Sequence, residues 1–198
     1  RTVHVNLRHY QPEYRTVIPE RVIGFGRRRQ SLAKDVIVAV DQSGSMADSV
    51  VYASLFGSVL RDVPALRTSL VAFDTSVTDL TPVLQDPVDV LFGVQLGGGT
   101  DIAQALAYCR RLITRPNDTV LILISDLFEG GNTDLLRARM AELIRSGVTV
   151  LCLLALSDDG APVHDRAMAA DLAELGATVL ACTPERFPDV LASALERR

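Results

Sequence analysis

Three short stretches of this chain carry oxygen-bearing side chains at places that a parallel sheet would bring together. The first, Asp41-Gln42-Ser43-Gly44-Ser45, follows five consecutive apolar residues. The second is a glycine-rich approach, Gly97-Gly98-Gly99, which presents Thr100 ahead of a helix-like run. The third is Asp126, which closely follows a second apolar run. Two serines, one threonine and two aspartates, with no His or Cys nearby, form a hard donor set that suits Mg²⁺ or Mn²⁺ and suits Zn²⁺ poorly.

The elements that would position these side chains follow from the apolar pattern. Residues 36–40 are Val, Ile, Val, Ala and Val, which is typical of a strand buried on both faces of a parallel sheet. We predict further strands at 68–73, 77–80, 120–124, 148–156 and 178–182, and helices at 49–61, 102–113, 133–145, 165–175 and 184–195. Residues 88–94 fit a helix and a strand equally well.

Strands that alternate with long helices indicate right-handed βαβ units. The predicted fold class is therefore α/β, with a doubly wound, mostly parallel sheet, one short antiparallel edge strand and helices on both faces. In such sheets, ligands bind at the carboxyl ends of the strands. We predict that Asp41, Ser43, Ser45, Thr100 and Asp126 form a divalent-metal site there. Other acids near that edge have other expected roles: Asp101 caps the following helix, and Glu129, Asp158 and Asp159 are solvated loop acids.

Asp-x-Ser-x-Ser at 41–45, followed by Thr100 and Asp126, resembles the metal-ion-dependent adhesion site of von Willebrand factor A (vWA) domains. The sequence Asp-Gln-Ser-Gly-Ser-Met at 41–46 is similar to that of bacterial members, and the resemblance covers residues 35–198. It implies a Rossmann-like fold and a metal site in which Asp41 and Asp126 act through water. It also implies a partner protein whose Asp or Glu fills the remaining position on the ion.

Composition restricts the class of protein further. A chain of 198 residues with 48% hydrophobic and 22% charged residues is typical of a soluble globular domain. No apolar run is long enough for a membrane-spanning helix, so we expect no membrane contact. The three cysteines, Cys109, Cys152 and Cys182, stand singly in apolar runs. They are predicted to be buried free thiols of a cytoplasmic protein, because disulfide and zinc sites need paired cysteines.

Charge divides the chain near residue 34. Residues 1–34 hold eight Lys or Arg against two Glu, whereas residues 35–198 hold twelve basic residues against twenty-two acids. We therefore predict a basic amino-terminal arm or linker at 1–34 and a vWA domain at 35–198. Arg27-Arg28-Arg29 is the densest basic point, but three arginines with little aromatic surface favour a solvated linker over a nucleic-acid contact.

Catalysis has little support in the sequence. His164 is the only histidine beyond the arm, so no Ser–His–acid set is available, and a phosphate-binding Gly-x-x-x-x-Gly-Lys motif is absent. The alternative to a binding module is a Mg²⁺-dependent phosphohydrolase that uses a strand-end aspartate. Ser43 stands where such enzymes carry a second aspartate, and the only lysine, Lys34, precedes the first strand. We therefore expect a protein that is not an enzyme.

The basic arm that leads into the first strand, together with the cytoplasmic character, resembles the bacterial CoxE-like group of vWA proteins. That group works beside MoxR-type AAA+ ATPases, and the alternative is its near relative, the D-type subunit of magnesium or cobalt chelatases. The resemblance implies an adaptor domain that captures a partner carboxylate and works with such an ATPase in complex assembly or metalloenzyme maturation.

Overall fold

The computed structural model describes residues 10–11, 16–17, 34–46, 66–83, 98–154, 164–181 and 187–196. The chain divides into two units, residues 1–31 and residues 32–198. In the first unit, the two-residue strands β1 (Tyr10–Gln11) and β2 (Thr16–Val17) pair antiparallel. The second unit contains all five predicted metal ligands.

The second unit is built on a six-stranded sheet in the order β5-β4-β3-β6-β7-β8. The strands are β3 (Lys34–Asp41), β4 (Leu66–Phe73), β5 (Val77–Asp79), β6 (Thr119–Ser125), β7 (Thr149–Leu154) and β8 (Thr178–Ala181). Every neighbouring pair is parallel except β4 and β5, which pair antiparallel at the edge. The predicted fold class is confirmed, including its short antiparallel edge strand.

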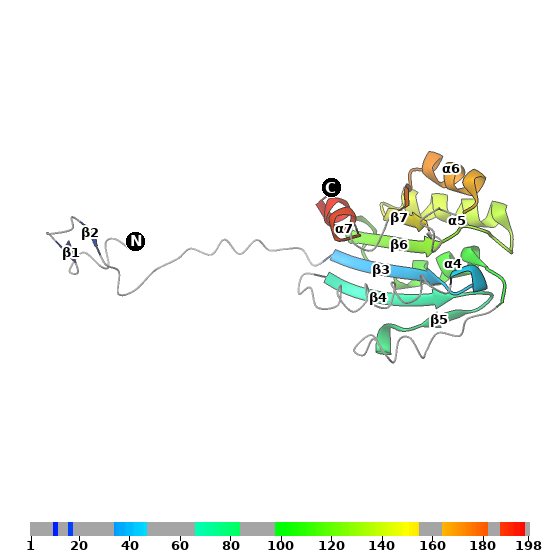
Figure 1. The fold of residues 1–198 in the computed structure, drawn as a ribbon, viewed down its shortest axis with the longest axis horizontal. Coiled ribbons are helices and arrows are strands. Elements are labelled where there is room, and N and C mark those ends of the chain that lie inside the picture. Colours follow the sequence, from blue (N-terminus) through cyan, green and yellow to red (C-terminus); the bar gives the residue numbers. More distant parts are fainter. Residues whose placement is uncertain are drawn as a thin grey trace. The chain divides into compact units, whose positions relative to one another are not determined.

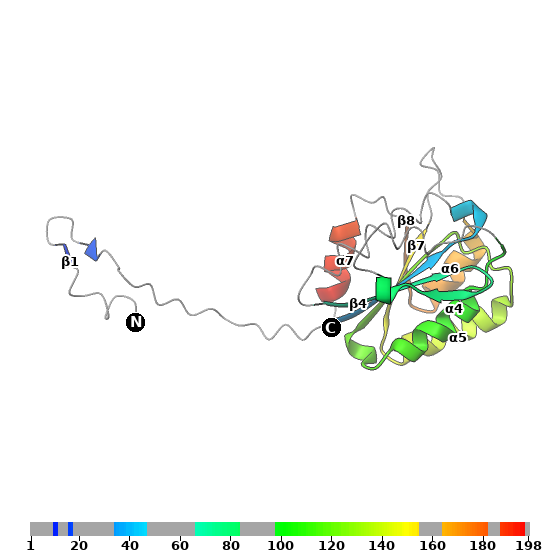
Figure 2. The ribbon, with the colours of Figure 1, turned by 90° about the horizontal axis from the view of Figure 1, so that it is seen from below.

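Side chains alternate across the central strand and divide the core into two layers. Ile37 and Ala39 pack in a cluster with residues of α4 (Ile102–Leu112), α5 (Thr133–Arg145) and α6 (Arg166–Glu174). Val36, Val38 and Val40 pack in a second cluster with Leu191 and Ala194 of α7 (Phe187–Glu196). Figure 2 shows α7 on one side of the sheet and α4 and α5 on the other. An aliphatic strand buried on both faces thus places its carboxyl end between two helix layers.

The ends of several elements differ from the prediction. Lys34 is the first residue of β3 and does not precede the strand, because it is already paired with Leu66 of β4. Helix α4 ends at Leu112, since Ile113 is extended ahead of Pro116. Four parts of the prediction lie outside the described residues. They are the helix at 49–61, the ambiguous segment 88–94, the last two residues of the strand at 148–156 and the first three of the helix at 184–195.

Two of the three cysteines belong to the described core. Cys109 and Cys152 are free and buried, and burial raises the pKa of each thiol to about 12. Such thiols stay protonated and unreactive. The prediction of buried free thiols is confirmed for these two, while Cys182 lies outside the described residues.

Among the described helices, none combines the length and the apolar character that crossing a membrane requires.

Candidate metal centre

The strands that carry or precede two of the predicted ligands, β3 and β6, end on the same side of the sheet (Figure 1). Asp41 is the last residue of β3, and Asp126 follows β6, which pairs directly with β3. Ser43 is in the loop after Asp41, and Thr100 precedes α4. The exposed fractions of Asp41, Ser43, Thr100 and Asp126 are 0%, 6%, 7% and 3%. Four buried polar side chains at one edge require either mutual hydrogen bonds or a bound group.

Asp41 is held by donors on both of its carboxylate oxygens. The N–H of Ser43 donates to Oδ1 at 2.9 Å, and the hydroxyl of Ser125 donates to Oδ2 at 2.7 Å. Burial raises the pKa of Asp41, these hydrogen bonds oppose the rise, and the negative charge of Asp126 adds to it. The two acids therefore lie close enough to repel each other, and a divalent cation would relieve that repulsion.

The loop after β6 turns sharply at Leu127. Its φ of 63° is the only positive value at a non-glycine residue in the described part of the chain, yet its side chain is 1% exposed. The N–H of Leu127 donates to Ser125 Oγ at 3.0 Å, and that of Phe128 donates to Asp126 Oδ1 at 3.1 Å. A left-handed conformation costs a residue with a side chain about 1–2 kcal/mol. The buried leucine and the two hydrogen bonds offset that strain and fix the position of Asp126.

Thr100 is tied to the same loop through its backbone. The N–H of Gly130 donates to the Thr100 carbonyl at 2.8 Å, and a Cβ at Gly130 would lie 2.9 Å from that oxygen. Only glycine permits this approach. Glu129 accepts the N–H of Ile102 at 2.8 Å and that of Gly131 at 2.9 Å. The loop before α4 and the loop after β6 are therefore joined, so the positions of Thr100 and Asp126 are coupled.

Comparison with known proteins identifies the family. The model described as "VWA domain containing CoxE-like protein" matches residues 1–191, which includes the basic arm. The chain belongs to this family of CoxE-like vWA proteins. It is also 43% identical over 196 residues to the uncharacterized protein YehP of Escherichia coli (strain K12), covering 98% of this chain and 52% of the relative. The chain thus spans about half the length of this curated relative.

Solved structures show the same fold at low sequence identity. A von Willebrand factor type A protein from Catenulispora acidiphila is 15% identical with a TM-score of 0.59, over 83% of this chain and 43% of that one. An aerotolerance-related membrane protein from Bacteroides fragilis is 17% identical with a TM-score of 0.60, over 83% of this chain and all of that one. Both support a vWA fold for this domain.

The donor set of the vWA domain fits a hard divalent cation. Carboxylate and hydroxyl oxygens at the end of a strand and in the adjoining loops are the ligand types that Mg²⁺ and Mn²⁺ prefer. The described residues contain no group of three or more His, Cys, Asp or Glu side chains that could hold a metal ion. Because three of the five predicted ligands carry hydroxyls, their site would not form such a group. Ser45 lies in the short turn η2 (Gly44–Met46), and its side chain is outside the described atoms.

Two residues around this site have roles that differ from the sequence prediction. Glu129 was expected to be a solvated loop acid, but it is only partly exposed: burial raises its pKa, while the N–H groups of Ile102 and Gly131 stabilise its charge. Ser125, which the sequence prediction did not assign, donates directly to Asp41. A lone hydroxyl at the end of an aliphatic strand is the signal that could have identified it, since a buried hydroxyl needs a partner.

The role predicted for Asp101 is confirmed. Its carboxylate accepts the N–H of Gln104 at 2.7 Å and caps α4. Asp158 and Asp159, the other two acids predicted to be solvated, lie outside the described residues.

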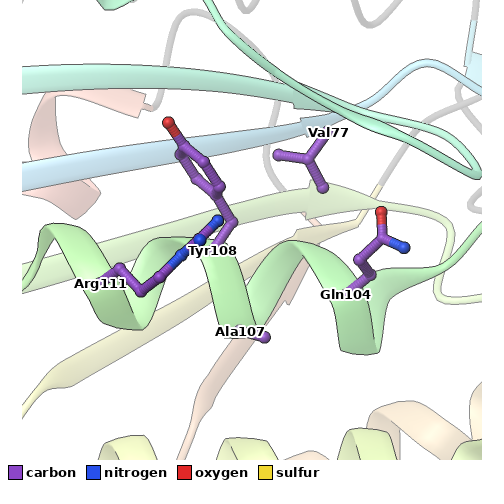
Figure 3. Close-up of a pocket in the computed structure, with 5 residues that line it drawn as sticks. All are labelled: Val77, Gln104, Ala107, Tyr108 and Arg111. Atoms are coloured by element: carbon purple, nitrogen blue, oxygen red, sulfur yellow. The ribbon is translucent and has the colours of Figure 1, made fainter.

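A separate open pocket of about 490 Å³ lies between β5 and α4 (Figure 3). Its described lining residues are Val77, Gln104, Ala107, Tyr108 and Arg111, and none of them is a predicted metal ligand. The Arg111 guanidinium lies 4.7 Å from the centre of the Tyr108 ring, and the Tyr108 hydroxyl donates to Asp79 at 2.9 Å. These contacts join the edge strand to α4.

Proposed function

We propose that this CoxE-like vWA domain is a metal-dependent protein-binding module and not an enzyme. In this proposal, Ser43, Ser45 and Thr100 hold Mg²⁺ or Mn²⁺, and Asp41 and Asp126 act through water. The bound ion supplies a positive charge that binds an Asp or Glu of a partner protein. The observation that carries the proposal is the convergence of two buried aspartates with Ser43 and Thr100 at one sheet edge.

Hydroxyl ligands explain why a partner carboxylate would be favoured. Serine and threonine oxygens are neutral, so they leave most of the charge of a divalent ion uncompensated. Asp41, with both oxygens engaged by Ser43 and Ser125, is positioned to orient water and does not need to contact the ion directly. A carboxylate from outside then supplies the missing negative charge, so the site gains most from an acidic partner.

The geometry of β3 argues against the phosphohydrolase alternative. Asp41 has no exposed surface, and both of its carboxylate oxygens already accept hydrogen bonds, so attack on a phosphate would require breaking them. Lys34 is seven positions before Asp41 at the opposite end of the same strand. At about 3.3 Å per residue, this separation is about 23 Å, too far for a lysine to assist chemistry at Asp41.

The finer proposal is that the partner is a MoxR-type AAA+ ATPase in the cytoplasm. Membership of the CoxE-like family supports this partner, because the sequence resemblance to that group implies an adaptor of such ATPases. The buried free thiols Cys109 and Cys152 suit a reducing compartment. The adaptor would serve complex assembly or metalloenzyme maturation.

Surface plasmon resonance against a MoxR-type ATPase tests the function. Binding should weaken about thirtyfold with EDTA or with Thr100→Ala. Losing one side of a buried charged contact costs roughly 2–5 kcal/mol, and about 1.4 kcal/mol corresponds to a factor of ten in affinity. Thr133→Ala is the matched control, since Thr133 is an exposed threonine at the start of α5. Equal affinity with Mg²⁺, with EDTA and with Thr100→Ala would contradict metal-dependent capture.

A further inference from the structure

We propose that Ser125 is the residue that positions both acids of this metal centre, so that metal affinity depends on a serine outside the Asp-x-Ser-x-Ser motif. The inference rests on the proposed function and concerns how the site is built. Ser125 is the last residue of β6 and is fully buried.

The first link runs from Ser125 to Asp41 across two strands. Val40 of β3 pairs with Ile124 of β6, so Asp41 and Ser125 are the next residues along the two neighbouring strands. The hydroxyl of Ser125 donates to Asp41 Oδ2 at 2.7 Å, a length typical of a hydrogen bond to an ionised carboxylate. The N–H of Ser43 holds the other oxygen. Two donors from different segments therefore fix the rotation of the Asp41 carboxylate.

The second link runs from Ser125 to the loop that carries Asp126. Ser125 Oγ accepts the N–H of Leu127 at 3.0 Å, and Leu127 has the strained φ of 63°. Because an N–H can only donate, this bond uses a lone pair of the oxygen and leaves the hydroxyl hydrogen for Asp41. The next N–H along the loop, that of Phe128, donates to Asp126. One hydroxyl thus connects the orientation of Asp41 with the turn that places Asp126.

Removing this hydroxyl should weaken metal binding although it touches no ion. Outer groups that orient metal ligands contribute about 10- to 100-fold in metal affinity when they are mutated. Ser125→Ala takes away the donor to Asp41 and the acceptor for Leu127 together, whereas Ser125→Thr keeps the hydroxyl. A positioning role predicts loss in the first variant and recovery in the second.

A matched control exists at the other end of the same strand. Thr119 begins β6, is 1% exposed, and its hydroxyl donates to the Arg115 carbonyl at 2.7 Å. Thr119→Val therefore removes one partly buried hydrogen bond from β6 without touching the metal centre. A loss of metal affinity that comes only from a general loss of stability should therefore also appear in Thr119→Val.

Isothermal titration of the full chain with Mn²⁺ tests the inference, with thermal unfolding of each metal-free variant measured alongside. We expect Ser125→Ala to bind about 10- to 100-fold more weakly than the wild type, as for other outer-shell groups. Ser125→Thr should stay close to wild type, and Thr119→Val should bind normally even if it unfolds earlier. Should Ser125→Ala fail to fold, Ser125→Cys replaces it, because a thiol is a weak donor of similar size.

Two results would overturn the inference alone. One is equal Mn²⁺ affinity of Ser125→Ala and wild type, and the other is an equal loss in Thr119→Val. A wild-type chain that binds no Mn²⁺ would instead overturn the proposed function and, with it, the role given to Ser125.

Discussion

The two aspartates of β3 lie at opposite ends of one strand and are stabilised in different ways. Asp35, near the amino end, accepts two hydrogen bonds from the Arg115 guanidinium, at 2.8 Å and 3.2 Å. Asp41, at the carboxyl end, accepts one N–H and one hydroxyl, and its strongest charged neighbour is another acid, Asp126. The chain supplies a cation for the first aspartate and none, among the described residues, for the second.

Backbone conformation also differs between the amino ends and the carboxyl ends of the strands in this sheet. Near the amino end of β7, the sharp turn at residue 147 has a φ of 99° and is made by a glycine. At the carboxyl end of β6, the positive φ of 63° falls on Leu127. The turn at the amino end is therefore made by a glycine without strain, whereas the turn at the carboxyl end carries backbone strain at Leu127 and lies beside two acids. Such features persist where the surrounding structure supports them, and they are concentrated at functional sites.

The largest expected effect is a difference in metal binding between variants of Asp41 and Asp35. Asp41→Ala should abolish measurable Mn²⁺ binding in isothermal titration, because it removes one of two carboxylates from a site whose other donors are neutral. Asp35→Ala should bind Mn²⁺ as the wild type does, since it lies at the other end of the strand. Similar losses in both variants would mean that the two ends do not differ in function.

The next effect measures the strain at the carboxyl end. Leu127→Ala should lower the free energy of unfolding by about 2–5 kcal/mol, because a buried leucine is lost. Leu127→Gly loses the same side chain but adopts positive φ freely, so it should be about 1 kcal/mol more stable than Leu127→Ala. Urea denaturation of both variants measures the difference. A glycine variant less stable than the alanine variant would show that the loop is not strained.

The smallest effect concerns charge in the metal-free protein. The pKa of Asp41 is raised in the folded state, so the folded state binds a proton more readily than the unfolded state does. As pH rises above the ordinary pKa of an aspartate, ionisation of Asp41 therefore destabilises the fold. Asp41→Asn should therefore raise the melting temperature by a few degrees at pH 7, with a gain that shrinks as pH falls toward 4.

Asp35→Asn supplies the opposite case. It should lower the melting temperature by a few degrees at pH 7, because the Arg115 guanidinium loses an ionised partner that lies 2.8 Å away. Calorimetry at several pH values compares the two variants. A stabilisation by Asp41→Asn that did not change with pH would contradict the assignment to its charge.

Local sequence determined the fold class and the positions of the candidate ligands. The aliphatic run before Asp41 became a strand buried on both faces, because no other element accommodates five consecutive apolar residues between two helix layers. Helix α5 has the predicted bounds, because Asn132 caps its first turn and Gly147 follows its end. Asp41, Ser43, Thr100 and Asp126 reached one edge because parallel strands end there, and metal binding by them stays a prediction.

Only the tertiary structure decided how these residues are held. The hydroxyl that fixes Asp41 belongs to Ser125, 84 positions away, and the carboxylate that joins Thr100's loop to Asp126's loop belongs to Glu129. Neither contact has a local pattern, because both depend on how β3, β6 and α4 pack. Leu127 likewise adopts its left-handed conformation because the core accepts its side chain and Ser125 Oγ accepts its N–H. The candidate ligands could be named from the sequence alone. Burial and long-range hydrogen bonds set their geometry, since these free energies arise only when distant segments meet.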